Sequence, residues 1–414
     1  MNTIQNTKVL TIGQSADLFV KGKKEYYKQW MFDKPILVSK KTLEVANLLQ
    51  KLMHKGINRF VRNYDQYASM MPLSHKVSEI IKIFEEKEYQ VGTYRTDFVF
   101  DSENNMRLIE ITCRFALNGL FLPSIMESVA ADHKHTYLRD AKTKDTYSRI
   151  FGYMKNRFGD TNRIYVLKGS DTRNASKIYT ELLSRCGYIM EDVSYENLDE
   201  LVHTIEDQAV IISELTLEEI ESLNLQTITE LSTKNIINDF RTVFLIHDKR
   251  FFAVLHNDAF LSDTFTTEEI AFWKNYTIPT YTRIADHSIL WEQAKGNKSD
   301  WIIKHSTLGK SQKIYAGLVM TEAEWNNIFL DDELDMMILQ RWIPQTTVEG
   351  TVNGKKHSDF VTGTLLFVDD EFFGFGDFRT SSHPVINVVD HRKYCSLIMD
   401  EELGESHREN YYTF

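Results

Sequence analysis

Between residues 163 and 215, apolar strand-like segments alternate with helical segments, and this alternation constrains the fold of the 414-residue chain more than any other feature. Parallel strands need a crossover connection, usually a helix, so the pattern predicts a parallel sheet of Rossmann type. We expect its strands and helices at 163–167, 174–186, 188–193, 198–205 and 209–212. The turn after the first strand, Lys168-Gly-Ser-Asp-Thr172, lacks a GxGxxG pattern, so dinucleotide binding is not predicted.

A hairpin is expected just before this sheet. Its strands, at 94–100 and 106–112, show β-like alternation, and a cluster of turn formers at 101–105 separates them. A turn centred between positions 103 and 104 places Asp97 opposite Glu110 and Arg95 opposite Thr112. The predicted shared face consists of Arg95, Asp97, Val99, Leu108, Glu110, Thr112 and Arg114.

The facing carboxylates of Asp97 and Glu110 are the most informative pair in the sequence. Directly opposed Cβ atoms lie about 4.5–5.5 Å apart, and like charges there destabilise a strand pair. A divalent cation that bridges to phosphate oxygens would supply the missing counter-charge, because Mg²⁺ usually takes one or two carboxylates plus substrate phosphates. The alternative is a solvated hairpin in which Arg95 and Arg114 neutralise the two carboxylates.

Further along the chain, three features are suited to binding a nucleotide. Lys304 ends an apolar strand and precedes a polar loop that contains Gly309, so it could reach phosphate; the alternative is an edge lysine whose ammonium reaches water. Lys249 lies beside the apolar segment 251–255, which we expect to be a strand. The extended segment 340–343 offers main-chain groups for an adenine edge, and its alternative is an ordinary strand end.

Amphipathic periodicity predicts a helical layer over the first 90 residues. The remaining expected elements are helices at 43–53, 77–84 and 123–132, strands at 301–304 and 336–340, and a hairpin of 361–368 with 372–375.

Composition restricts the class of protein. Lys and Arg number 48 against 59 Asp and Glu, a net charge of −11, and nucleic-acid binding usually needs a basic surface. Three widely spaced cysteines without a CxxC motif favour neither a disulfide framework nor a structural zinc site. The thirteen histidines lack metal-ligand spacing, so we expect each to be a surface or hydrogen-bonded residue. With neither a signal-peptide pattern nor a run of about 18 apolar residues, we expect a cytoplasmic protein without a membrane span.

Taken in chain order, these segments resemble the circularly permuted ATP-grasp ligases, of which glutathionylspermidine synthetase is a well-known type. The family has an R-x-D strand and, about a dozen residues later, an E-x-N strand; a Rossmann-like domain, two lysines, an adenine hinge and a late arginine follow. The matching positions are Arg95-Thr-Asp97, Glu110-Ile-Thr112, residues 163–215, Lys249, Lys304, Gln340-Arg-Trp-Ile343 and Arg379. Thr112 departs from the family's asparagine. A threonine can offer one oxygen, which would preserve metal binding; the alternative is one fewer ligand, weaker metal affinity or lost activity.

The resemblance implies an α+β fold class: a circularly permuted ATP-grasp fold with an inserted Rossmann-like α/β (pre-ATP-grasp) domain and a helical N-terminal region. Four parts are expected on this basis. They are a helical N-terminal region at 1–90, a first ATP-grasp segment with the metal-binding hairpin at 91–155, the Rossmann-like domain at 156–245, and a nucleotide-binding segment at 246–414.

The resemblance also implies a reaction, the ATP-dependent joining of a carboxylate to an amine through an acylphosphate, with ATP and Mg²⁺ as cofactors. Asp97, Glu110 and Thr112 would hold the metal, and Lys249, Lys304, Gly309, Gln340, Arg341, Trp342 and Ile343 would bind ATP. Arg95 and Arg379 would be catalytic, the latter by stabilising charge on the transferred phosphoryl group. Arg95 and Arg114 would clamp the anionic substrate, and Asn118 would add a polar contact.

The implied partners are a small-molecule carboxylate and an amine, such as an amino acid, a polyamine or a peptide, and neither a nucleic acid nor a membrane. Two alternatives stay open at this point. One is a catalytically inactive ATP-binding regulatory or scaffold protein of the same fold, which the threonine at position 112 suggests. The other is an ATP-grasp phosphotransferase.

Overall fold

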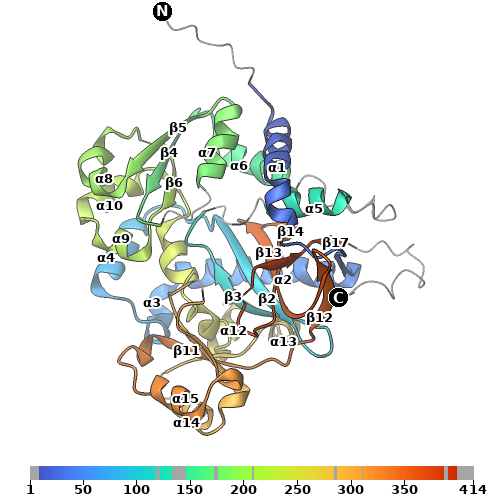
Figure 1. Cartoon of the computed structure of the whole chain (residues 1–414). Helices are drawn as coiled ribbons and strands as arrows, with labels where there is room; N and C mark the ends of the chain where they lie inside the picture. Colours follow the sequence, from blue (N-terminus) through green and yellow to red (C-terminus); the bar gives the residue numbers. More distant parts are fainter. Residues whose placement is uncertain are drawn as a thin grey trace, which may run out of the picture.

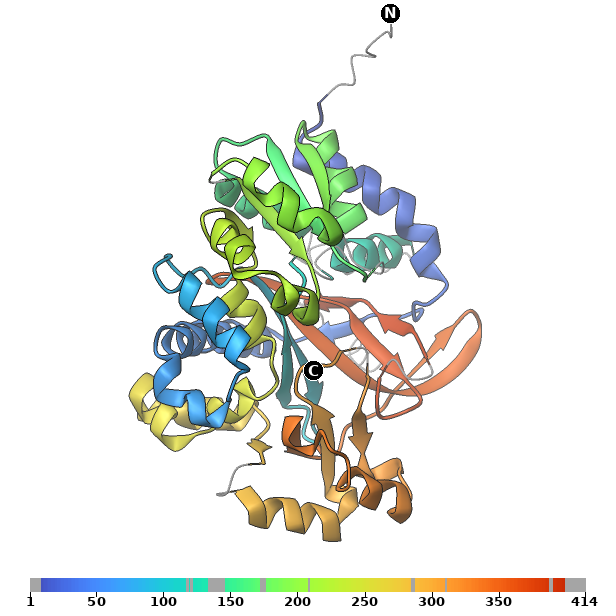
Figure 2. The same ribbon diagram turned by 90° about the vertical axis from the view of Figure 1, so that its left-hand side faces the viewer.

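The computed structural model describes residues 9–116, 119, 122–132, 146–171, 176–207, 209–283, 287–309, 311–386 and 390–398. These residues form a seven-stranded antiparallel sheet, a four-stranded antiparallel sheet, a four-stranded parallel sheet and one pair of short parallel strands. In Figures 1 and 2 the parallel sheet lies at the top, the seven-stranded sheet in the middle and the small antiparallel sheet at the bottom. No helix in this part of the chain is long and apolar enough to span a bilayer.

The first 90 residues are mainly helical, as predicted. Their helices are α1 (Ile12–Lys28), α2 (Lys40–Arg62), α3 (Tyr64–Tyr67) and α4 (His75–Phe84). Thr11 and Ser39 begin α1 and α2 as N-caps, because each hydroxyl accepts a hydrogen bond from a main-chain N–H in the first turn. The short strand β1 (Ile36–Val38) pairs with β17 (Ser396–Ile398), so segments from the two ends of the chain lie side by side.

The seven-stranded sheet contains the predicted hairpin. Its order is β16 (Arg392–Tyr394), β15 (Phe378–Ser381), β13 (Lys355–Val368), β2 (Thr93–Phe100) and β3 (Met106–Thr112), while β12 (Val348–Val352) and β14 (Glu371–Phe375) also pair with β13. The pairing of β13 with β14 confirms the second predicted hairpin.

The predicted register of the first hairpin is right on one side of a bulge and wrong on the other. Arg95 pairs with Thr112 and Asp97 with Glu110, as expected. A bulge after Asp97 then shifts the register, so that Phe98 pairs with Leu108 and Val99 with Arg107. Because the bulge places an extra residue on β3, the prediction that Val99 and Leu108 share a face was wrong.

The predicted parallel sheet is confirmed. It has the order β5 (Ile189–Ser194), β4 (Arg163–Lys168), β6 (Val210–Glu214) and β7 (Asn235–Ile237), and every pair is parallel. The helices of this region are α5 (Leu122–Asp132), α6 (Thr146–Phe158), α7 (Ser176–Arg185), α8 (Tyr195–Leu201), α9 (Leu217–Ser222) and α10 (Leu225–Ser232). The carboxyl ends of β4 and β6 lie next to each other at Lys168 and Glu214.

The small antiparallel sheet has a hydrophobic core of its own. Its order is β10 (Ile314–Ala316), β9 (Trp301–His305), β11 (Met337–Arg341) and β8 (Thr280–Thr282), which confirms the strands predicted at 301–304 and 336–340. The helices α14 (Ser288–Gly296) and α15 (Glu322–Ile328) contribute Trp291 and Trp325, which are buried in one cluster with Trp301. This separate core lets the unit hold its shape beside the larger sheet.

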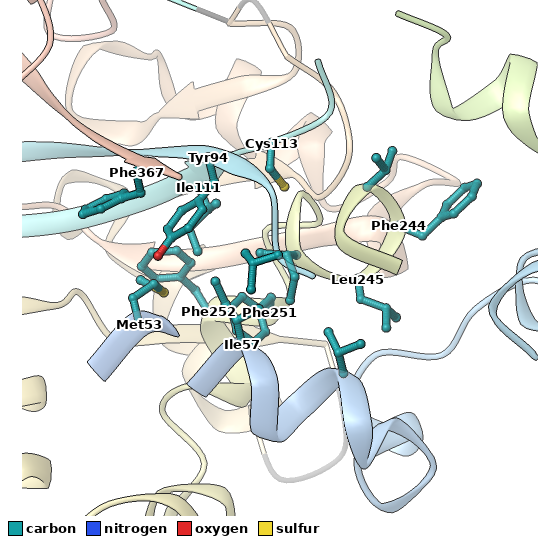
Figure 3. Close-up of a cluster of buried hydrophobic side chains, with 14 of the residues drawn as sticks. Met53, Ile57, Tyr94, Ile111, Cys113, Phe244, Leu245, Phe251, Phe252 and Phe367 are labelled. Atoms are coloured by element: carbon teal, nitrogen blue, oxygen red, sulfur yellow. The ribbon is translucent and has the colours of Figure 1, made fainter. Parts of the chain in front are cut away.

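One expected strand is a helix. The apolar segment 251–255 forms α11 (Phe251–Val254), between the π-helical turn η4 (Thr242–Ile246) and the helices α12 (Asp258–Thr264) and α13 (Thr267–Tyr276). Phe251 and Phe252 are fully buried in a cluster with Met53 and Ile57 of α2, which Figure 3 shows beneath the central sheet. A short run that is apolar on every side fits a buried helix as well as a buried strand, so the pattern could not separate the two.

The structure has the expected mixture of helices and sheets. The circularly permuted ATP-grasp arrangement and the four segment boundaries stay predictions.

Candidate functional site

A cavity of about 330 Å³ lies between the seven-stranded sheet and the small antiparallel sheet, within the size range of ligand pockets. All of the predicted site residues that the structure describes line this cavity. They are Arg95, Asp97, Glu110, Thr112, Arg114, Lys249, Lys304, Gly309, Gln340, Arg341, Trp342, Ile343 and Arg379. The remaining predicted residue, Asn118, lies outside the described residues. Segments up to 284 positions apart in the sequence therefore meet at one site.

Asp97 is buried, with 4% of its surface exposed, and two arginines compensate its charge. Arg379 donates a hydrogen bond from Nη2 to Asp97 Oδ2 at 2.5 Å, and Arg95 Nε lies 3.8 Å from Asp97 Oδ1. Arg114 lies 3.8 Å from Asp171 instead. The hairpin is therefore not the solvated one of the alternative interpretation, in which Arg95 and Arg114 neutralise the carboxylates. Asp97 Oδ1 is buried, and no described residue forms a hydrogen bond with it.

Glu110, opposite Asp97, keeps its negative charge because of the surrounding cations. Burial alone would raise the pKa of this carboxyl, but Lys249, Lys304, Arg379 and Arg95 together hold the pKa below its ordinary value. Nearby carboxylates act on Arg379 in turn. Burial would lower the pKa of its guanidinium, but Asp97 and Asp377 raise the pKa above its usual range.

Lys304 is only 4% exposed, and its strand β9 lies between β10 and β11. The alternative of an edge lysine that reaches water is therefore wrong for this residue. Burial is the largest effect on the Lys304 ammonium and lowers its pKa, while the carboxylate of Glu110 opposes the shift. Among the described residues, no hydrogen bond or ion pair holds this ammonium, which leaves it available to an anion in the cavity.

Lys249 connects the site to the loop after β9. Its main-chain N–H donates to Ser306 O at 2.9 Å, and its Nζ donates to Leu308 O at 2.7 Å. Its neighbours in sequence, Asp248 and Arg250, form a buried ion pair at 2.7 Å. The position of Lys249 is therefore fixed from both sides, next to the loop that contains Gly309.

The expected adenine hinge lies at the end of β11. Gln340 is 1% exposed and donates from Nε2 to Thr280 Oγ1 at 2.8 Å, while its buried Oε1 has no hydrogen-bond partner in the part of the chain that the structure describes. Arg341 places its guanidinium 3.9 Å from the centre of the Trp301 ring. Because the Arg341 side chain stacks on Trp301, the main-chain N–H and C=O groups of 341–343 are the groups suited to forming hydrogen bonds with an adenine edge. Apolar walls come from Ile109, Ile278, Ile302, Leu308, Ile314 and Ile343.

The donor set in the cavity fits Mg²⁺. Asp97 and Glu110 face each other across β2 and β3, Thr112 follows on the same strand, and oxygen ligands of this kind are what Mg²⁺ prefers. A third acidic ligand is missing from the described part of the chain, where no group of three or more His, Cys, Asp or Glu side chains is placed to hold a metal ion. Substrate phosphates and water would therefore complete the coordination.

Two ionisable residues that the sequence did not single out also line the cavity: Asp171 and His247. Asp171 follows β4, at the carboxyl end of a parallel strand, and that position is a general signal for ligand binding. His247 was expected to be a surface or hydrogen-bonded histidine. Its only sequence signal is its place two positions before Lys249.

The family model described as the AnkG N-terminal domain matches residues 45–245, slightly less than half of the chain. The matched region contains the hairpin with Asp97 and Glu110 and ends four residues before Lys249. No curated protein matches the chain.

This match corrects the expected family. The matching model is not one of an ATP-grasp ligase family, so the assignment to the circularly permuted ATP-grasp ligases was wrong. Apart from the Rossmann-like region, the matching positions are single residues or motifs of three or four residues, and such short patterns recur by chance. The geometry and charge of the cavity therefore carry the functional proposal.

Proposed function

We propose that the cavity binds Mg-ATP and that the protein is an ATP-dependent carboxylate–amine ligase. The observation that carries this proposal is the charge balance of the site. Four cationic side chains, Arg95, Lys249, Lys304 and Arg379, surround the two facing carboxylates, Asp97 and Glu110. Of the other charged residues in the wall, Arg114 and Asp171 match each other, and Arg341 stacks on Trp301. The surplus of two positive charges, in a site largely shielded from water, matches a polyphosphate whose charge is partly neutralised by a divalent cation.

The residues of the cavity supply what phosphoryl transfer needs, which is chiefly positioning and charge neutralisation. Lys249 and Lys304 would bind phosphate oxygens, and Arg379 would stabilise charge on the transferred group. Asp97 and Glu110 would hold Mg²⁺, which when bound neutralises phosphate charge. Thr112 stands beside them with a single hydroxyl.

Two arginines of the cavity wall support an acid substrate. Arg95 and Arg114 would clamp a carboxylate, because a guanidinium matches the two oxygens of a carboxylate group. The acid would accept the γ-phosphoryl group to form an acylphosphate, and an amine would then displace phosphate to give an amide. An enzyme of this kind needs cellular ATP, so a cytoplasmic location belongs to this proposal.

The test is a screen of ADP release with Mg-ATP and pairs drawn from L-amino acids, dicarboxylic acids, dipeptides and spermidine. We expect ADP and free phosphate to form only when both an acid and an amine are present. ATP binding without ADP release in any combination would instead favour the inactive ATP-binding alternative. ADP with a phosphorylated product and no free phosphate would favour the phosphotransferase.

A further inference from the structure

The side chain of Gln340 projects from the small antiparallel sheet toward the cavity. Residues that pair directly across neighbouring strands lie on the same face of a sheet. Gln340 of β11 pairs with Ile302 of β9 and with Thr280 of β8, and Ile302 lines the cavity together with Gln340. The preceding residue, Leu339, lies on the opposite face, in the tryptophan cluster. The face of the small sheet that carries Gln340 is therefore the one that forms the cavity wall.

Both N–H bonds of the Gln340 amide are used within the protein. Its Nε2 donates to Thr280 Oγ1 at 2.8 Å and to the main-chain carbonyl of Ile109 at 3.2 Å. The Thr280 hydroxyl donates its own proton to Ile278 O at 3.1 Å, so it acts as an acceptor toward Gln340. Because Ile109 belongs to β3, this amide connects the small sheet to the seven-stranded sheet at the cavity.

These bonds fix which atom of the amide is nitrogen and which is oxygen. A carbonyl oxygen accepts hydrogen bonds and never donates them, so turning the amide over would set Oε1 of Gln340 against the carbonyl oxygen of Ile109. The oxygen is thus left as the free end of the amide. It is buried, and none of the described residues donates a hydrogen bond to it. A buried acceptor without a donor is costly, so a ligand that donates a hydrogen bond to Oε1 removes that cost.

The surroundings of this acceptor fit a flat, largely apolar group that carries a donor at its edge. The cavity has apolar walls at Ile278, Ile302 and Ile343. Among the common purine bases, adenine carries an amino donor at C6, whereas guanine carries a carbonyl acceptor there. An amino group at C6 would donate to Oε1 of Gln340, but a carbonyl oxygen would meet Oε1 as one acceptor against another. An amide held in one orientation therefore favours the first kind of base and disfavours the second.

We propose that the side-chain amide of Gln340 selects the base of the nucleotide: Oε1 accepts a hydrogen bond from the C6 amino group of adenine and disfavours nucleotides with a carbonyl group at C6. This role is separate from the main-chain contacts expected of 341–343, because it belongs to a side chain that a substitution can remove. The inference rests on the proposed binding of Mg-ATP and deepens it by naming the feature of the base that the site recognises.

The experiment compares three nucleotides in the wild-type protein by calorimetric titration with Mg²⁺ present. They are ATP, purine riboside triphosphate, which has only hydrogen at C6, and ITP, which has a carbonyl group at C6. Purine riboside triphosphate differs from ATP only by the missing amino group, so it leaves Oε1 of Gln340 unpaired. We expect it to bind about 10–100-fold more weakly than ATP, in the range for leaving a buried acceptor unsatisfied. ITP should bind more weakly still.

The variant Gln340→Met keeps the length of the side chain and removes the acceptor. ATP and purine riboside triphosphate should then bind within about threefold of each other, because neither leaves a buried acceptor unpaired at this position. ITP should bind more tightly than it does to the wild type, because the opposing oxygen is gone. General damage to the site would weaken all three nucleotides, so a gain for ITP separates base selection from a purely structural role.

Gln50→Met in α2 is the matched control. Gln50 is 3% exposed and is not among the described residues that line the cavity, so this variant should keep the wild-type order of affinities.

Two results would overturn the role of Gln340. One is equal affinity of the wild type for ATP and purine riboside triphosphate, and the other is a Gln340→Met protein that keeps the full preference for ATP. The first needs no variant, so the role can be refuted even if Gln340→Met is too unstable to titrate. Equal and tight binding of all three nucleotides would leave the nucleotide site standing without this role. Failure of all three to bind would instead remove the proposed function.

Discussion

Asp97 and Glu110 face each other across β2 and β3. Burial raises the pKa of Glu110, but Lys249, Lys304, Arg379 and Arg95 hold it below its ordinary value, so the charged form of Glu110 stabilises the fold. From the sequence alone, two opposed carboxylates would repel, and replacing Glu110 by glutamine would leave stability unchanged or slightly raise it if Arg95 and Arg114 did not already neutralise the pair. With the surrounding cations in place, we expect the opposite effect. Removing one negative charge leaves the surrounding cations with less compensation.

Glu110→Gln is therefore expected to lower the melting temperature of the ligand-free protein near neutral pH. Because the pKa of Glu110 is lowered in the folded protein, its stabilising contribution is present above the unfolded value of 4.5 and is lost as pH falls through the folded pKa. The difference between wild type and Glu110→Gln should thus shrink below pH 4.5. Thermal unfolding of both proteins across pH 3–8 measures this, with the exposed turn residue changed by Glu103→Gln as the control. An unchanged melting temperature at neutral pH would contradict the charge balance.

Lys304 is buried in the cavity wall, and no described residue bonds to its ammonium. Lys304→Met keeps the apolar stem and removes the charge. We expect ATP to bind about 10–100-fold more weakly, in line with about 1.5–3 kcal/mol for a hydrogen bond to a charged group. The ligand-free stability should not fall, because a buried charge is removed. Calorimetric ATP titration checks this, with Lys295→Met on α14 as the control, and equal dissociation constants would refute the assignment.

At the scale of elements, the position of Asp97 depends on how closely β13 packs against β2. Gly363 of β13 pairs with Phe98, the residue after Asp97, and a Cβ atom at Gly363 would lie 2.2 Å from the Phe98 ring. The Phe98 ring is itself fully buried. A side chain at position 363 therefore cannot be accommodated without moving the strand that carries Asp97.

Gly363→Ala is expected to destabilise the protein by about 1–3 kcal/mol, the usual cost of overpacking a core. It should also weaken Mg-ATP stabilisation, because β2 shifts. Gly152→Ala in α6 is the matched control, since no atom lies within 4 Å of a Cβ there and alanine favours a helix by about 0.5–1 kcal/mol. Urea unfolding of the three proteins measures the difference. A Gly363→Ala protein as stable as wild type would mean that β13 and β2 are less tightly coupled than their packing indicates.

At the scale of the whole molecule, the cavity joins two units with separate cores. The seven-stranded sheet provides the carboxylates and Arg379, whereas the small sheet, with its tryptophan cluster, provides Lys304 and Gln340. A ligand that contacts both units stabilises them together, because it binds the folded state and not the unfolded chain.

We expect Mg-ATP at about a hundredfold over its dissociation constant to add about 2.7 kcal/mol to the free energy of unfolding. ATP with EDTA should add less, because its uncompensated charge exceeds the surplus of two positive charges in the site. Differential scanning calorimetry with Mg-ATP, ATP with EDTA, and Mg²⁺ alone provides the comparison. A melting temperature that is indifferent to millimolar Mg-ATP would count heavily against the proposed function.

The sequence by itself determined the local structure wherever its apolar side chains follow a clear helical or strand periodicity. The helices of the first 90 residues, the parallel sheet and the pairing of Asp97 with Glu110 follow from side-chain spacing and turn formers, which are short-range properties. Spacing gave the wrong register beyond the bulge after Asp97, and it predicted a strand where α11 forms. At both places, packing against distant segments decides the conformation.

Only the tertiary structure decided the character of the site. Lys304 became a buried cation because β9 is flanked by two strands, and Asp97 is compensated by Arg379 from a strand about 280 positions later. His247 lines the cavity, which its position in the sequence does not reveal. Burial, the sum of nearby charges and unsatisfied hydrogen bonds depend on which distant segments meet, and side-chain periodicity carries no information about that.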